Sequence, residues 1–126
     1  MSNLSETITS PAEVTYVHKR IDSTDGIVTH AEFAVVSLRL EPLSNDRGLE
    51  FVNASKYLLA EHISGAEAGV RAAAEKGVIN GGNVVGIRAV LLDGIYHDVD
   101  SNSATFMLAA REAFWEAMHK GSPKLI

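Results

Sequence analysis

The stretch Asp93-Gly-Ile-Tyr-His-Asp-Val-Asp-Ser101, followed by Ala104-Thr-Phe-Met-Leu-Ala-Ala-Arg-Glu-Ala-Phe114, joins two strongly patterned segments through a dense polar cluster. Upstream of it, apolar residues alternate from Val84 to Leu92, which predicts a half-buried strand ended by a turn at Asp93-Gly94. Downstream of Asp100, apolar residues at helical spacing predict a helix stopped by Gly121 and Pro123. The residues expected inside are Val85, Ile87, Ala89 and Leu91 on the strand, and Phe106, Ala110, Ala113 or Phe114, and Ala117 on the helix.

The earlier part of the chain predicts three more strands and one more helix. Strands are expected at Ala12–Arg20, at Phe33–Leu40 and at Leu49–Asn53, and the last two should form a hairpin. Asp22–Gly26 is a turn cluster between the first two strands. One apolar stripe then predicts a helix that Gly77 ends; its members are Leu59, Ile63, Ala66, Val70 and Ala73.

Length and composition indicate one globular domain. The chain has 126 residues, of which 46% are hydrophobic and 21% charged. We expect a flexible tail at 1–10, or a strand that pairs outside this chain, and one domain over 11–126. These elements predict an α+β fold, a two-layer sandwich in which about four strands carry two helices on one face.

Several classes of function are disfavoured. There is no cysteine, so disulfides and thiolate metal sites are excluded. No segment reaches the roughly 20 apolar residues of a membrane span, and the first residues lack a secretory pattern, so a cytoplasmic protein is expected. A net charge of −5 is unlike that of an autonomous nucleic-acid binder. Gly81-Gly82 precedes a strand and lacks the Lys of a phosphate loop, so no nucleotide site is predicted.

The polar cluster Tyr96–Ser101 allows several interpretations. His97 with Asp98 or Asp100 could be an acid–base pair, the three side chains could bind a metal, or the loop could be a recognition tip. The plainer interpretation is structural, with Asp100 or Ser101 capping the following helix. The other histidines form no pattern and are expected at the surface or its boundary; they are His18, His30, His62 and His119.

Tyr96–Ser101, between a strand and an Ala- and Phe-rich helix, resembles the motif of the fourth domain of elongation factor G, a translational GTPase. Glu41-Pro42-Leu43, Gly48–Asn53 and Gly65–Gly77 also resemble segments of that family. The likeness extends from about Glu6 to the end of the chain.

The resemblance implies a fold, a partner and a site. The fold would contain a left-handed βαβ crossover, against the usual right-handed rule. The partner would be the ribosome, at the small-subunit decoding region beside the tRNA–mRNA, with His97 exposed at the tip. The GTPase would reside in other domains, so the resemblance implies no enzyme, cofactor or metal, and a monomer. The implied contact residues are Tyr96, His97, Asp98 and Asp100 in one loop, and Asp22, Ser23, Thr24, Asp25 and Gly26 in another, at the same end of the sheet.

Three departures from the family pattern indicate a diverged or stand-alone relative. Asp22–Val28 replaces a glycine-rich tip loop that resembles Gly-Gly-Arg-Gly-Gln-Tyr/Phe. Ser55–Leu59 replaces Gly-Gly-x-Ile-Pro, and Asn83 stands where a proline is expected. The alternatives to a ribosome module are a small enzyme using His97, Asp98 and Asp100, or a stand-alone interaction protein on the same scaffold.

Overall fold

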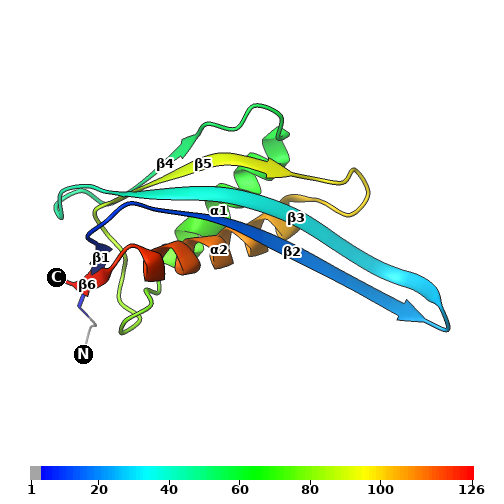
Figure 1. The fold of residues 1–126 in the computed structure, drawn as a ribbon, viewed down its shortest axis with the longest axis horizontal. Helices are drawn as coiled ribbons and strands as arrows, with labels where there is room; N and C mark the ends of the chain where they lie inside the picture. The colour runs from blue at the N-terminus through cyan, green and yellow to red at the C-terminus, as the bar shows by residue number, and fades with distance from the viewer. Residues whose placement is uncertain (1–3) are drawn as a thin grey trace.

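The computed structural model describes residues 4–126, which form a sheet covered by two helices, with a small second sheet at one end (Figure 1). Its elements follow the chain in the order β1 to β4, α1, β5, α2 and β6. Their bounds are β1 Glu6–Ile8, β2 Ala12–Thr24, β3 Ile27–Pro42, β4 Leu49–Asn53, α1 Ala60–Ala74, β5 Ile87–Ile95, α2 Ser103–Lys120 and β6 Pro123–Leu125. The predicted two-layer α+β class is confirmed.

The main sheet has the strand order β2-β3-β5-β4. β2 and β3 form a long antiparallel hairpin, and β5 pairs antiparallel with the other edge of β3. β4 pairs parallel with β5, from Leu49 opposite Ile87 to Asn53 opposite Leu91, and α1 provides the crossover between them. The predicted hairpin between β3 and β4 is therefore wrong. The free edge of β3 pairs with β5 instead, because the nine residues of β5 can form more hydrogen bonds with β3 than the five residues of β4.

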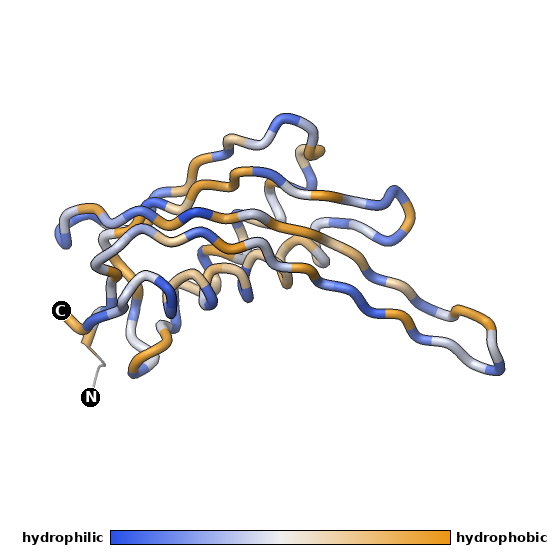
Figure 2. The backbone as a smooth tube through the Cα atoms, viewed as in Figure 1, coloured by the Kyte–Doolittle hydropathy of each residue, from blue (hydrophilic) through white to orange (hydrophobic). Residues whose placement is uncertain are grey.

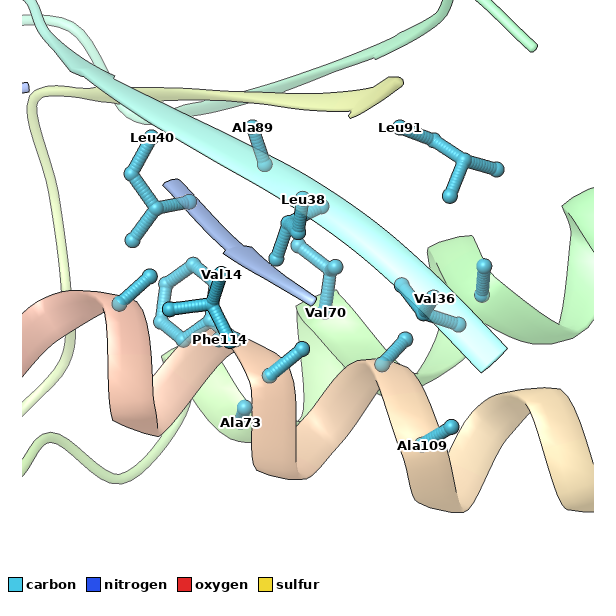
Figure 3. Packing of buried hydrophobic residues seen from close by; sticks show 14 of the residues in the cluster. Val14, Val36, Leu38, Leu40, Val70, Ala73, Ala89, Leu91, Ala109 and Phe114 are labelled. Atoms are coloured by element: carbon cyan, nitrogen blue, oxygen red, sulfur yellow. The ribbon is translucent and has the colours of Figure 1, made fainter. Parts of the chain in front are cut away.

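The core lies between the sheet and the helices. Val36, Leu38 and Leu40 of β3 point toward the helix layer, where Phe114 of α2 and Val70 of α1 meet them (Figure 3). All five are completely buried. These positions follow the predicted periods of two on the strand and 3.6 on the helices. Burial of such side chains contributes about 1.5–3 kcal/mol each.

The two helices pack with almost no space between their backbones. A Cβ built on Gly65 of α1 would lie 2.2 Å from the carbonyl oxygen of Ser103, and one on Gly69 would lie 2.3 Å from that of Met107. Only glycine permits this approach at both positions. α1 itself is shorter than predicted at both ends, because Leu59 is its exposed N-cap and Glu75, not Gly77, is its C-cap.

The second sheet corrects the prediction of a tail at 1–10. β1 pairs antiparallel with β6, and Glu6, Thr7 and Ile8 are buried. The carboxylate of Glu6 accepts backbone N–H groups from Ile79, Asn80 and Gly82 at 2.9, 2.9 and 3.3 Å. Burial and these bonds fix the segment, which also finds its strand partner within the chain. Residues 1–3 of the predicted tail lie outside the described part.

Candidate functional site

The loop after β5 is built on Phe33 of β3. The Phe33 N–H donates to the carbonyl oxygen of Asp100 at 2.9 Å, and the Ser101 hydroxyl donates to the carbonyl oxygen of Phe33 at 2.5 Å. The same hydroxyl oxygen accepts the N–H of His97 at 2.9 Å. The backbone of 97–101 is therefore held in one shape by a residue far away in sequence. The turn predicted at Asp93-Gly94 is wrong, because β5 continues through these residues to Ile95 and leads into the loop. The pairing of β5 with β3 shifts by one register between Ser37 and Leu38.

The His97 side chain is exposed, as predicted, yet its plane is fixed. Its ring stacks on the ring of Phe33, with centroids 3.9 Å apart and planes 4° apart. One face of the imidazole is covered by Phe33, and the residue as a whole remains accessible. An exposed aromatic ring of fixed orientation is suited to contact with a partner, because little rotamer freedom is lost on binding.

Tyr96, the neighbour of His97, faces the core. Its ring lies 4.4 Å from the ring of His62, which in turn stacks on Phe106 at 4.6 Å. His62 is 1% exposed, so the prediction that it lies at the surface or its boundary is wrong. Burial lowers the pKa of His62, and the nearby Glu61 carboxylate opposes that shift only in part. Nδ1 of His62 accepts the Leu59 N–H at 3.3 Å, which explains why a histidine stands at this turn of α1.

The acidic side chains of the loop do not pair with His97 in the part of the chain that the structure describes. The Asp100 N–H donates to the carbonyl oxygen of His97 at 3.2 Å. Within residues 4–126, no side-chain hydrogen bond or ion pair joins His97 to Asp98 or Asp100, and no group of three or more His, Asp or Glu side chains could hold a metal. The predicted cap at Asp100 or Ser101 is also wrong. Asn102 is the N-cap of α2, since its side chain accepts the Thr105 N–H at 3.0 Å. Asp98 is exposed, and Val99 is 93% exposed.

The predicted turn cluster Asp22–Gly26 forms the end of the long hairpin, where the register shifts between Asp22 and Ser23. The ladder continues to the pair Thr24 and Ile27, so only Asp25 and Gly26 form the loop, with φ of 52° and 79°. A two-residue loop with two positive φ values matches the twist of the strands. Next to it, Ile27 and Val28 are 68% and 59% exposed, and this apolar tip is visible in Figure 2.

The hairpin face that carries Glu32 is polar and internally paired. Glu32 binds the Nε2 atoms of His18 and His30 at 2.8 and 2.6 Å. Hydrogen bonds from His30 and then His18 hold the pKa of Glu32 below its usual value. Asp22 pairs with Arg20 at 3.1 Å. These side chains thus satisfy one another.

The opposite, uncovered face of the sheet carries a ladder of ion pairs across all four strands. Its members alternate in sign and are Glu13, Arg39, Glu41, Arg88, Glu50 and Arg47. Each arginine of this ladder pairs with at least one glutamate, so the ladder itself offers no basic patch for phosphate groups.

The two predicted tip segments lie at the same end of the sheet, as expected (Figure 1). They are not in contact at their tips. The 97–101 loop meets β3 at Phe33, whereas the turn lies beyond Ile27, about 20 Å further along at 3.3 Å per residue. Phe33 is the site residue that the sequence analysis missed; its only signal was an aromatic side chain at the start of an alternating strand.

A two-layer α+β module with a projecting hairpin and a Tyr-His-Asp-Val-Asp-Ser loop fixed at its base defines a class of translation-factor domain. The family described as elongation factor G, domain IV, matches residues 3–122, and the chain belongs to this family. No helix within residues 4–126 is long and apolar enough to cross a membrane.

Known relatives agree with this assignment. Elongation factor G 2 of Hahella chejuensis (strain KCTC 2396) is 43% identical over 123 residues, and elongation factor G of Anaplasma marginale (strain Florida) is 39% identical over 123. Each alignment covers 96% of this chain and 17% of the relative, so the chain spans about a sixth of their length. A crystal structure of a Thermus thermophilus protein superposes with a TM-score of 0.81 at 34% identity, covering 98% of this chain and 18% of that one.

Proposed function

We propose that this chain is a ribosome-contacting module of translation elongation, which reaches the small-subunit decoding region and the tRNA–mRNA during translocation. The observation that carries the proposal is the loop fixed on Phe33, which presents His97 at the projecting end of a member of this family. The contact residues would be Tyr96, His97, Asp98 and Asp100, with Asp22, Ser23, Thr24, Asp25 and Gly26 on the hairpin. The module would act in the cytoplasm as a monomer, without nucleotide, cofactor, metal or catalysis of its own.

The charges of the tip limit its affinity. Asp22, Asp25, Asp98 and Asp100 are repelled by a phosphate backbone, and the chain carries a net charge of −5. A domain held by neighbouring domains gains an effective concentration worth a factor of about 10² or more. We therefore expect the isolated module to bind ribosomes weakly and to act only when it is tethered.

A domain exchange tests the proposal. Residues 4–126, which include the paired β1 and β6, replace the fourth domain of a bacterial elongation factor G, and single-turnover translocation is measured. The chimera should translocate faster than a factor that lacks the domain and slower than the parent. His97→Ala in the chimera should slow it further, whereas His119→Ala, an exposed histidine near the end of α2, should not. A chimera no faster than the truncated factor, or equal effects of the two substitutions, would refute the proposal.

A further inference from the structure

The segment after α1 surrounds the carboxylate of Glu6 with backbone N–H groups. Ile79 and Asn80 each donate to it at 2.9 Å, and Gly82 donates at 3.3 Å. Gly81 is the exception, since its N–H has no hydrogen-bond acceptor within residues 4–126. The residue before it, Asn80, is exposed. A backbone nitrogen without an acceptor therefore follows directly after an accessible side-chain amide.

The side chain of Asn80 is folded over the backbone of Gly81. Its Oδ1 accepts the Gly82 N–H at 3.0 Å, which closes a ring that contains the Gly81 nitrogen. A donor at Oδ1 polarises the amide and stabilises the negative charge that develops on this oxygen when Cγ is attacked. Gly81 has a φ of 78° and no Cβ that could shield its nitrogen. The contacts thus bring a nucleophile and a polarised carbonyl group together on adjacent residues.

We infer that Asn80 is a site of spontaneous deamidation, a reaction that makes asparagine one of the thermolabile residues. A base from the solvent removes the Gly81 amide proton, and the nitrogen attacks Cγ of Asn80. The new N–Cγ bond replaces the Cγ–Nδ2 bond, and Nδ2 takes up a proton and leaves as ammonia. Water then opens the cyclic imide. Cleavage of its N–Cγ bond gives an aspartyl residue, whereas cleavage between the nitrogen and the main-chain carbonyl carbon gives an isoaspartyl residue.

The reaction changes the contacts of Glu6. The Gly82 N–H is shared between Oδ1 of Asn80 and Oε2 of Glu6, so after deamidation two carboxylates compete for the same donor. Like charges at this separation repel each other, and Glu6 is 0% exposed, so water cannot compensate its charge. The isoaspartyl form also lengthens the main chain between Ile79 and Gly82, which both hold Glu6.

Either product therefore loosens β1, which carries Glu6. This strand lies at the end of the molecule remote from the hairpin turn and the 97–101 loop (Figure 1). The inference is for this reason independent of the proposed function.

The chain contains a matched internal control in Asn53. Its Oδ1 accepts the N–H two residues further on, from Ser55 at 3.0 Å, as that of Asn80 does. The Ala54 N–H between them, however, donates to the carbonyl oxygen of Leu91 at 2.8 Å and is not free to attack. Asn53 therefore has the same polarised amide without the unpaired nitrogen.

Peptide mass spectrometry of the full chain, kept in mildly alkaline buffer, follows the conversion of each asparagine. Asn80 should convert at least about tenfold faster than Asn53. An enzyme that methylates isoaspartyl residues should label the aged chain. Asn80→Gln keeps an amide but would have to form a larger ring, so the variant should lose this labelling. Conversion of Asn80 no faster than that of Asn53, or equal labelling of the aged variant, overturns the inference.

Asn80→Asp measures the effect of the product directly. The backbone amides of residues 6–8 should exchange with solvent about tenfold faster than in the unmodified chain. Asn53→Asp adds the same charge to an exposed residue at the end of β4 and should leave this exchange unchanged. Equal exchange at residues 6–8 in the two variants would overturn the predicted loosening of β1.

Discussion

The imidazole of His97 lies parallel to the ring of Phe33, with centroids 3.9 Å apart, and the two residues belong to different tip elements. His97 follows β5, whereas Phe33 lies in β3, at the point from which the hairpin projects. The orientation of the loop is therefore set by the strand that carries the hairpin. A displacement of the hairpin base would be transmitted to His97 through this contact and through the hydrogen bonds of Phe33 with Asp100 and Ser101.

Replacement of Phe33 by Leu should loosen the loop while preserving the strand. The substitution retains the backbone hydrogen bonds and removes the ring that orients His97. We expect faster amide hydrogen exchange at 97–101 and a loss of about 1 kcal/mol in the free energy of unfolding. Phe51→Leu, on β4, is the control, because it removes a ring that packs on the core without touching the loop. Unchanged exchange at 97–101 in the Phe33 variant would contradict the assigned role.

Ser101→Ala should destabilise the protein by about 1–3 kcal/mol, as measured by urea unfolding. The hydroxyl is the donor to the Phe33 carbonyl and the acceptor for the His97 N–H, so its loss leaves two partly buried groups unpaired. Ser103→Ala, two residues later on the exposed start of α2, should change the free energy of unfolding by less than about 0.5 kcal/mol. Similar values for both serines would show that the loop does not depend on these bonds.

The buried His62 predicts a loss of stability in mild acid. Its pKa is lowered on folding from 6.5, so the folded state favours the neutral ring and the unfolded state binds more protons. The contribution to stability is complete above about pH 6.5 and decreases as the pH falls below that value. The Glu32 carboxyl, whose pKa is also lowered, adds to the loss only near and below its ordinary value of 4.5. Urea midpoints between about pH 7.5 and about pH 5.5 measure the first effect.

His62→Phe serves as the reference for that experiment, because it retains an aromatic ring beside Tyr96 and Phe106 without a titrating group. Its stability should vary less with pH over the same interval. An equal slope in the wild-type protein and the variant would assign the pH dependence to other residues.

Gly65→Ala and Gly69→Ala should each destabilise the protein by about 1–3 kcal/mol, although alanine is the better helix former. A methyl group at either position would meet a carbonyl of α2 at close to 2 Å, so the helices must separate. Gly48→Ala is the matched control, since its Cβ would meet nothing within 4 Å. Thermal unfolding compares the three variants, and an unaffected melting temperature for Gly65→Ala would mean that the helices separate at little cost.

Asp25→Asn should strengthen ribosome binding by the domain-exchange factor. Asparagine tolerates the left-handed conformation that Asp25 adopts, so the hairpin is preserved while one repulsive charge is removed. Asp46→Asn removes the same charge from the loop at the opposite end of the sheet and is the control. Sedimentation at two salt concentrations measures both variants. If Asp25→Asn has no larger effect than Asp46→Asn, the hairpin turn does not approach RNA.

The periodic elements were predictable from the sequence because their signals are local. The spacing of apolar residues within each element indicates which side chains are buried. The structure confirms this for Val36, Leu38 and Leu40 on the strand and for Phe106 and Phe114 on the helix. The motif at Tyr96–Ser101 also allowed the family to be inferred, which the comparisons confirm.

The parts that failed depend on contacts between distant residues. Glu6 can be buried only because backbone N–H groups of residues 79–82 donate hydrogen bonds to its carboxylate. β4 pairs parallel with β5 because β5, and not β4, pairs with the edge of β3. Nothing near Phe33 in the sequence indicates that its ring supports His97. His62 is expected at the surface or its boundary because the histidines form no pattern in the sequence, whereas its buried environment comes from Tyr96 and Phe106, which lie far along the chain.

The pairing of β1 with β6 determines how the module responds to mechanical load. The two strands are antiparallel, and the Ile126 N–H donates to the Ser5 carbonyl at 2.9 Å, so both ends of the described chain leave from the same side of this small sheet. A pulling force applied through those ends would break its hydrogen bonds one after another, as a zipper opens, instead of shearing them together. β6 would therefore detach at low force, whereas β1 would stay in place through the hydrogen bonds of Glu6 with residues 79–85. The C-terminal end would lengthen while the four-stranded sheet and its tip remained intact.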